Sequence, residues 1–249
     1  MADWKLIALD IDGTTVPRKS TLSGENRRWI LEAKEQGLPV TFATGRHRRG
    51  LVEEYVRELK IEVPFVTLNG GEVWTPQGEL LARHLMQAEE IRYLYEITQR
   101  HDLYYWGATT EEAYNPENFP SPTRIGHYQW IKFGYHTRDV TVLAEIWDEL
   151  RDHGGFTLSN SDAYNIEVNA PDTDKATGLQ AVADYLHIHR DEVAVMGDSL
   201  NDIPMFRWAG RAIAVGNAQD AAKEAADEVT VNAAENAVAV TIQQLLDSR

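Results

Sequence analysis

Four acidic residues stand directly after short apolar segments, where strands of a sheet would end. They are Asp10, Asp12, Asp198 and Asp202. If the two segments are strands of one parallel sheet, their carboxyl ends deliver the four side chains to the edge where ligands bind. Clustered carboxylates repel one another, and oxygen ligands without a nearby His or Cys favour Mg²⁺ over Zn²⁺. The pattern predicts a magnesium site, although each acid could also belong to an ordinary turn or helix cap.

Further polar groups suit the oxygens of a phosphate. A third apolar segment ends in Thr44, Gly45 and Arg46, which offer a hydroxyl, a flexible turn and a guanidinium. Lys175 opens a predicted helix, where a cation is mildly unfavourable with the helix dipole, so its position is informative. The plain alternatives are a common Thr-Gly turn and a solvated lysine. Within the basic run 46–49, we expect Arg46 to reach the site and the other arginines to be solvated.

Short apolar segments alternate with helical patterns toward both ends of the chain. Segments of this length suit strands buried on both faces of a parallel sheet, and apolar residues at helical spacing separate them. The strand-like segments are 6–9, 40–43, 64–68, 193–196 and 212–215, and the clearest helical stripes are 22–33 and 179–186. The alternation predicts an α/β fold with a doubly wound, Rossmann-like parallel sheet.

The middle of the chain has a different pattern, with longer aromatic strand-like segments around two helical stripes. The stripes are 91–95 and 140–150, and the strand-like segments are 103–106, 130–133 and 164–168. This pattern predicts an α+β domain inserted into the α/β domain. We expect a core of residues 1–83 and 171–249 and an inserted cap of residues 84–170.

The predicted cap is rich in aromatic residues, namely Tyr93, Tyr95, Tyr104, Tyr105, Trp106, Tyr114, Tyr128, Trp130 and Tyr135. Aromatic rings in a lid can stack on a sugar or a heterocycle, but we expect most of these to form the core of the cap. Because Tyr104, Tyr105 and Trp106 alternate along one strand, they cannot all face the same side.

Composition limits the class of partner. The chain has 24 Lys+Arg against 39 Asp+Glu, a net charge of −15, which disfavours nucleic acids and anionic membranes as partners. It has no cysteine, which excludes disulfides and thiol catalysis. No segment approaches the ~20 apolar residues of a membrane span, and the apolar run before Asp10 is too short for a signal peptide. These features predict a soluble, cytoplasmic protein.

The motifs occur in the order of a known superfamily. Asp-x-Asp-Gly-Thr at 10–14, Thr-Gly-Arg at 44–46, the distant Lys175 and Gly-Asp-x-x-Asn-Asp at 197–202 resemble those of the haloacid-dehalogenase-like (HAD) phosphohydrolases. The resemblance covers essentially the whole chain, and the four motifs together are highly specific.

The position of the cap, between the second motif and the lysine, resembles the Cof-type class IIB branch. Leu68-Asn69-Gly70-Gly71, before the insertion, also matches that branch. Two positions depart from the family pattern, since Ala176 stands where glycine is usual and Thr15-Val16 where leucine is frequent. Neither departure removes a functional group.

The resemblance implies a Mg²⁺-dependent phosphatase that hydrolyses a small phosphorylated metabolite, such as a sugar phosphate, through an aspartyl-phosphate. Asp10 would be the nucleophile and a metal ligand. Asp12 would protonate the leaving alcohol and then activate water, with its backbone carbonyl toward the metal. The remaining roles would be phosphate binding by Thr44, Lys175 and Asn201, metal binding by Asp198 and Asp202, and substrate binding by Gly45 and Arg46.

The proposed chemistry sets further expectations. Asp12 must be protonated in the first step, so we expect it to be buried among the other carboxylates. The cap should cover the catalytic crevice and exclude water. We expect a monomer or weak homodimer. Two alternatives stay open, a phosphomutase with the same motifs and a non-catalytic protein that binds metal or a phosphorylated ligand. A transport ATPase is excluded, because the sequence has no membrane spans.

Overall fold

The computed structural model describes residues 4–101 and 103–248, and the chain divides into two compact units. The first unit combines Met1–Ala82 with Asp174–Arg249, and the second is Arg83–Thr173. The junctions therefore fall after Ala82 and Thr173, where the sequence suggested residues 83 and 170. Residues 1–3, 102 and 249, which the expected domain ranges include, lie outside the described residues.

The first unit contains a five-stranded parallel sheet with the order β13-β12-β11-β1-β2. Its strands are β1 (Leu6–Leu9), β2 (Val40–Phe42), β11 (Val193–Gly197), β12 (Arg211–Ala214) and β13 (Glu228–Val229). In the centre of the sheet Leu9 lies beside Phe42 on one neighbour and Met196 on the other. The predicted parallel α/β sheet is confirmed, and its central strands are fully buried, as their unbroken apolar sequences indicate.

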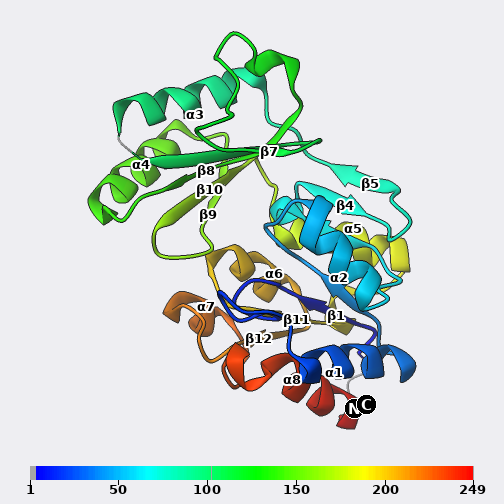
Figure 1. Cartoon of the computed structure of the whole chain (residues 1–249). Coiled ribbons are helices and arrows are strands. Elements are labelled where there is room, and N and C mark those ends of the chain that lie inside the picture. Colours follow the sequence, from blue (N-terminus) through cyan, green and yellow to red (C-terminus); the bar gives the residue numbers. More distant parts are fainter. Residues whose placement is uncertain (1–3, 102, 249) are drawn as a thin grey trace. The chain divides into compact units, whose positions relative to one another are not determined.

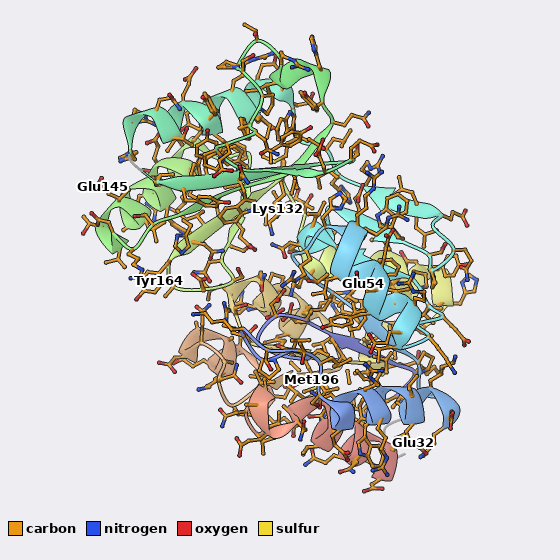
Figure 2. The ribbon with its side chains drawn as sticks, viewed as in Figure 1. Glu32, Glu54, Lys132, Glu145, Tyr164 and Met196 are labelled. Atoms are coloured by element: carbon orange, nitrogen blue, oxygen red, sulfur yellow. The ribbon has the colours of Figure 1, made fainter. Side chains whose placement is uncertain are left out.

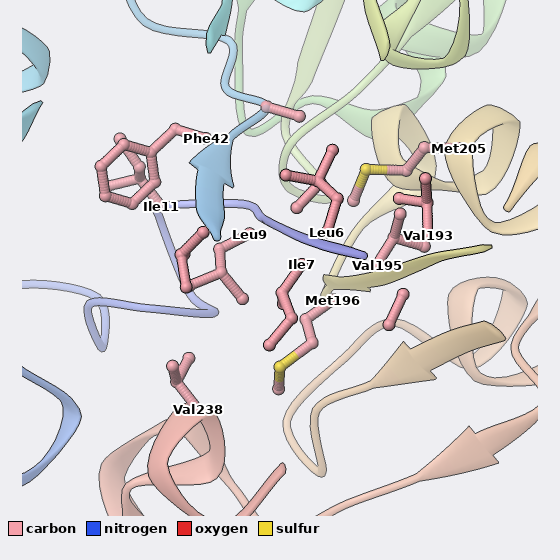
Figure 3. Packing of buried hydrophobic residues seen from close by; sticks show 14 of the residues in the cluster. Leu6, Ile7, Leu9, Ile11, Phe42, Val193, Val195, Met196, Met205 and Val238 are labelled. Carbon is pink, nitrogen blue, oxygen red and sulfur yellow. The ribbon is translucent and has the colours of Figure 1, made fainter. Parts of the chain in front are cut away.

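Helices cover both faces of this sheet. They are α1 (Gly24–Glu35), α2 (Glu53–Glu58), α5 (Lys175–Leu186), α6 (Ile203–Trp208), α7 (Asp220–Ala225) and α8 (Ala237–Asp247). Figure 1 shows α1 and α8 on one side of the sheet and α6 on the other. Alternate side chains of β1 serve the two faces, since Leu6 lies on the side of Met205 and Ile7 on the side of Val238 (Figure 3).

The ends of α1 follow from its sequence. The hydroxyl of Ser23 accepts a hydrogen bond from the N–H of Asn26 and caps the first turn. The helix ends before Gly37, whose φ of +75° is a conformation that favours glycine. Side chains along the first unit divide as expected: Met196 lies in the interior and Glu54 lies exposed on α2 (Figure 2).

The expected strand at 64–68 is present, and it has an antiparallel partner that the sequence did not predict. β3 (Phe65–Thr67) pairs antiparallel with β4 (Glu72–Trp74), and β5 (Leu80–Arg83) completes a three-stranded sheet. One parallel bridge, between Ala43 and Val66, links β3 to the chain that follows β2. The tight turn after β3 reverses the chain at once, so β4 pairs antiparallel with β3.

The second unit is an α+β domain, as predicted. Its antiparallel sheet has the order β7-β6-β8-β10-β9. The strands are β6 (Tyr104–Thr109), β7 (Ala113–Tyr114), β8 (Trp130–His136), β9 (Thr157–Ser159) and β10 (Asn165–Asn169), and the helices are α3 (Ala88–Arg100) and α4 (Val140–His153). Within this unit both helices lie on the same side of the sheet (Figure 1).

Most aromatic residues of the second unit form its core, as expected. All but Tyr104, Trp106 and the exposed Tyr164 belong to the hydrophobic cluster between the sheet and its helices or pack against it. Tyr105 stacks on Phe133 inside that cluster at a centroid distance of 6.0 Å. Trp106 instead lies over Gly134, where a Cβ atom would come within 2.2 Å of the indole ring. The alternation along β6 thus separates neighbouring rings, as predicted.

Short helical turns connect the main elements. They are η1 (Arg48–Val52), η2 (Leu68–Gly70), η3 (Ile125–His127), η4 (Arg190–Glu192), η5 (Leu200–Asp202) and η6 (Ala233–Glu235). Among the described residues, no helix has the length and apolar content to cross a bilayer.

Candidate active site

Three of the four predicted acids meet at the carboxyl end of the parallel sheet. Asp10 follows β1 and Asp198 follows β11, and these two strands are neighbours in register. One oxygen of Asp10, of Asp198 and of Asp202 lies within 4.8 Å of the other two. All three side chains are buried, Asp202 completely. The strands therefore concentrate negative charge where water cannot screen it.

Two glycines allow this close approach. Gly13 has a φ of +91°, and a Cβ atom built on it would lie 2.3 Å from Oδ2 of Asp198. A Cβ atom on Gly197 would lie 2.3 Å from Cγ of Asp202. Because real Cβ atoms do not come so close to other atoms, any side chain at either position would push a carboxylate away.

A buried lysine offsets part of the charge. Nζ of Lys175 lies 2.7 Å from Oδ1 of Asp10 and 2.6 Å from Oδ1 of Asp202, and its side chain is fully buried. Asp174 caps helix α5 by accepting from the N–H of Thr177 at 2.8 Å, so Lys175 begins the helix at a defined place. Burial alone would lower the pKa of Lys175, but Asp10 and Asp202 outweigh burial and raise it above its ordinary value.

The negative charge that Lys175 does not neutralise affects the pKa values of the acids. Burial raises the pKa of Asp10 well above its ordinary value, and Asp202 and Asp198 add to the effect while Lys175 opposes it. Burial, with the charge of Asp202, also raises the pKa of Asp198 to about 7. Oδ2 of Asp10 is buried and has no hydrogen-bond partner among the described residues. An oxygen-only cluster with excess negative charge and an unpartnered buried oxygen fits a hard divalent cation.

Among the three buried acids, Asp202 has the most complete set of hydrogen-bond donors around its carboxylate. Its Oδ2 accepts hydrogen bonds from the backbone N–H groups of Asp198 at 2.8 Å and Ser199 at 2.9 Å, while Oδ1 accepts from Lys175. These contacts hold the loop between β11 and η5 against the lysine. Asp202 therefore shapes the loop as well as contributing charge.

Asp12 does not join the buried cluster. Arg46 donates from Nε to its Oδ2 at 2.5 Å and from Nη2 to its Oδ1 at 2.6 Å, a bidentate ion pair. The Asp12 side chain is 41 % exposed, so the expectation that it is buried among the other carboxylates was wrong. Strand alternation predicts that Asp10 and Asp12 face one side, but the partner of Asp12 in the structure is a guanidinium.

The other predicted phosphate-binding residues lie around the cluster. Thr44 is fully buried, and its hydroxyl accepts from the N–H of Arg46 at 3.2 Å, across Gly45. Asn201, in η5, is also buried, and its amide donates to Oδ1 of Asn69 at 3.3 Å. Both residues therefore occupy the loops that follow strands of the first unit.

Two residues near the site received no role from the sequence. Asn69 contacts Asn201, and the sequence feature that could have indicated it is the Asn-Gly pair after a strand. Nη2 of Arg18 lies 3.4 Å from Oδ2 of Asp198, and no sequence pattern marked it.

Arg48, expected to be solvated, instead lies over the Trp74 ring at 4.1 Å from its centroid, because the aromatic face attracts the cation.

Comparison with known proteins identifies the protein family to which the chain belongs. Residues 7–148 and 127–242 match the family described as haloacid dehalogenase-like hydrolases, so the chain belongs to that family. The resemblance to HAD phosphohydrolases is thereby confirmed, and the chain is a phosphoric monoester hydrolase.

Individual relatives agree over nearly the full length. The chain is 36 % identical over 241 residues to the 5-amino-6-(5-phospho-D-ribitylamino)uracil phosphatase YcsE of Bacillus subtilis, covering 97 % of this chain and 95 % of that protein. A haloacid dehalogenase-like hydrolase from B. subtilis shares the fold with a TM-score of 0.85 at 23 % identity, over 97 % of this chain and 99 % of that one. A HAD subclass IIB sugar phosphatase gives a TM-score of 0.84 at 20 % identity, over 97 % and 98 %.

The raised pKa of Asp198 makes the stability of the metal-free protein depend on pH. Because the folded carboxyl group binds its proton more tightly than the unfolded one, its contribution is present at low pH and is lost as pH rises through about 7. We expect Asp198→Asn to weaken the fall in stability between about pH 5 and about pH 8, measured by urea unfolding in EDTA. Asp191→Asn, at a side chain that is 68 % exposed, is the control, and parallel curves for all three proteins would contradict the expectation.

Proposed function

We propose that this protein is a Mg²⁺-dependent phosphatase that hydrolyses a small phosphomonoester through an aspartyl-phosphate on Asp10. The observation that carries the proposal is the buried, unpartnered Oδ2 of Asp10 beside two other carboxylates and Lys175. Leaving such an oxygen without a partner is costly, so a site of this kind suits a ligand or a reaction. Asp10, Asp198 and Asp202 would hold Mg²⁺, which when bound neutralises charge on the phosphoryl oxygens.

The residues divide the work of two displacement steps. In the first, a carboxylate oxygen of Asp10 attacks phosphorus while the ester P–O bond breaks, and Asp12 gives its proton to the departing alcohol oxygen. In the second, Asp12 takes a proton from water, whose oxygen attacks phosphorus and releases Asp10 with inorganic phosphate. To act as the acid, Asp12 would have to leave its bidentate pair with Arg46, because that pair favours the carboxylate.

Three donors would hold the transferred group. Lys175 offers its ammonium, Thr44 its hydroxyl and Asn201 its amide, and all three side chains are buried in the first unit. Donors that are fixed before the reaction stabilise developing charge without reorganisation. Lys175 in addition reduces the repulsion between the carboxylate of Asp10 and a phosphate dianion, because its Nζ lies 2.7 Å from the attacking group.

The first candidate substrate is 5-amino-6-(5-phospho-D-ribitylamino)uracil. The relative that carries this activity in its name is 36 % identical and aligns over 97 % of this chain. That compound is a small phosphomonoester on a polyol chain, a class that the net charge of −15 does not disfavour, since local cations can bind it.

We expect this compound to give the highest kcat/KM in a panel of phosphomonoesters that includes sugar phosphates, ribitol 5-phosphate and p-nitrophenyl phosphate. Released phosphate is the readout, measured with Mg²⁺ and with EDTA, and EDTA should abolish release. A different best substrate would refute the specific assignment, whereas an isomerised product without phosphate release would show a phosphomutase. Mg²⁺ binding without turnover of any compound would show a non-catalytic protein.

Asp10→Asn should lower kcat by a factor on the order of 10³ or more, because the amide is not a nucleophile toward phosphorus. The change keeps the shape of the side chain, so circular dichroism should show an intact fold. Asp191→Asn, at an exposed position, should leave kcat unchanged. Normal turnover by Asp10→Asn would rule out the aspartyl-phosphate.

Arg46 is proposed to hold Asp12 and to meet the substrate phosphate. Removing the Arg46 side chain leaves the carboxylate of Asp12 without the guanidinium that binds it through two short hydrogen bonds. We expect Arg46→Ala to lower kcat/KM about 100-fold and Arg46→Lys to recover only part, because lysine cannot form the bidentate pair. Arg49→Ala, an exposed arginine of the same run, should change kcat/KM less than about twofold. An unchanged KM in Arg46→Ala would remove the role in substrate binding.

A further inference from the structure

The turn after β3, Leu68–Gly71, has an unusual backbone. Leu68, Asn69 and Gly70 have positive φ values of 51°, 56° and 92° in succession. A leucine in this region is disfavoured, and two successive left-handed residues other than glycine are rarer still. Such a conformation persists only where the surroundings hold it, and it often marks a functional position.

The backbone of this turn is joined to the loop that carries Thr44. The N–H of Asn69 donates to the carbonyl of Thr44 at 3.0 Å, and the N–H of Leu68 donates to the carbonyl of Arg46 at 3.0 Å. These bonds need the left-handed geometry, which turns successive N–H groups toward one loop. The turn thus sets the position of one proposed phosphate donor.

The next residue joins the turn to the segment that carries the lysine. A Cβ atom on Gly70 would lie 1.9 Å from the carbonyl oxygen of Asp174, the residue before Lys175. Gly178, one turn into α5, would likewise bring a Cβ atom within 3.2 Å of Cα of Gly70. The start of α5 is therefore packed directly on this turn, and with it the second proposed donor.

The side chain of Asn69 contacts the third donor. Its Oδ1 accepts from Nδ2 of Asn201 at 3.3 Å, and Oδ1 of Asn201 accepts from the hydroxyl of Ser199 at 3.0 Å. If the Asn201 amide turned by 180°, its oxygen would face Oδ1 of Asn69, so two acceptors would oppose each other. The contact with Oδ1 of Asn69 therefore favours the orientation in which Nδ2 of Asn201 faces Asn69, while the hydroxyl of Ser199 can donate or accept.

We propose that Asn69 is a positioning residue for phosphate binding. It fixes the side chain of Asn201 through the hydrogen bond from Nδ2 of Asn201, while the same turn holds the segments of Thr44 and Lys175. The inference rests on the proposed function, in which Asn201 binds the transferred phosphoryl group.

Asn69→Gly tests the side chain alone, because glycine adopts a φ of 56° without strain and keeps the N–H to Thr44. We expect KM for p-nitrophenyl phosphate and the inhibition constant of inorganic phosphate to rise about tenfold, the effect of losing one hydrogen bond that orients a donor. Asn236→Gly is the matched control, since Asn236 has φ 62° and ψ 45° against 56° and 41° for Asn69, and lies at the start of α8.

A double-mutant cycle with Asn201→Ala shows whether Asn69 acts through Asn201. In the Asn201→Ala background, Asn69→Gly should change the phosphate inhibition constant less than about twofold. Full additivity would overturn the proposal, as would an unchanged inhibition constant in the single variant. Loss of folding in Asn69→Gly but not in Asn236→Gly would also overturn it, because the side chain would then be structural. Failure of the proposed function has a different signature, namely no phosphate release by the unaltered protein.

Discussion

The ion pair of Lys175 with Asp10 and Asp202 is the interaction on which the rest of the site depends. Three carboxylates are buried within a few ångströms of one another, an arrangement that water would otherwise oppose by hydrating each charge. Losing one member of a buried pair costs about 3–5 kcal/mol, since the remaining charge has no partner. The lysine makes this concentration of charge compatible with folding, yet it offsets only part of it. The excess of negative charge that remains is what would attract a divalent cation to the proposed metal site.

The parallel sheet supplies the geometry for this interaction. β1 and β11 are neighbours, so residues far apart in the sequence, such as Asp10 and Asp198, follow the same edge. Lys175 reaches the same place because α5 begins at a capped position and packs on the turn after β3. The second unit is inserted between that turn and α5, and the first unit resumes at Asp174, directly before Lys175.

Part of this arrangement could be predicted from the sequence and part could not. Apolar segments that end in acids indicated the sheet edge, and the order of the motifs indicated the family. The pairing of Asp12 with Arg46 could not be predicted, because strand alternation fixes the side of a residue but not the partner that its side chain chooses. The partner of β3 was missed for a similar reason, since a tight turn with three positive φ values has no periodic signal. Arg48 on Trp74 depends on a contact between distant residues, which composition does not reveal.

The two glycines beside the acids would also affect which cations the proposed metal site can distinguish. Hydrogen atoms, the smallest substituents that a backbone can carry, set two distances: Gly13 lies against Asp198 in the loop after β11, and Gly197, at the end of β11, lies against Asp202. A small cation demands a tight shell of oxygens, while a larger one tolerates a wide and irregular shell. If the proposed metal site binds Mg²⁺, its selectivity for ionic radius would therefore depend on the main chain, at two positions that supply no side-chain ligand.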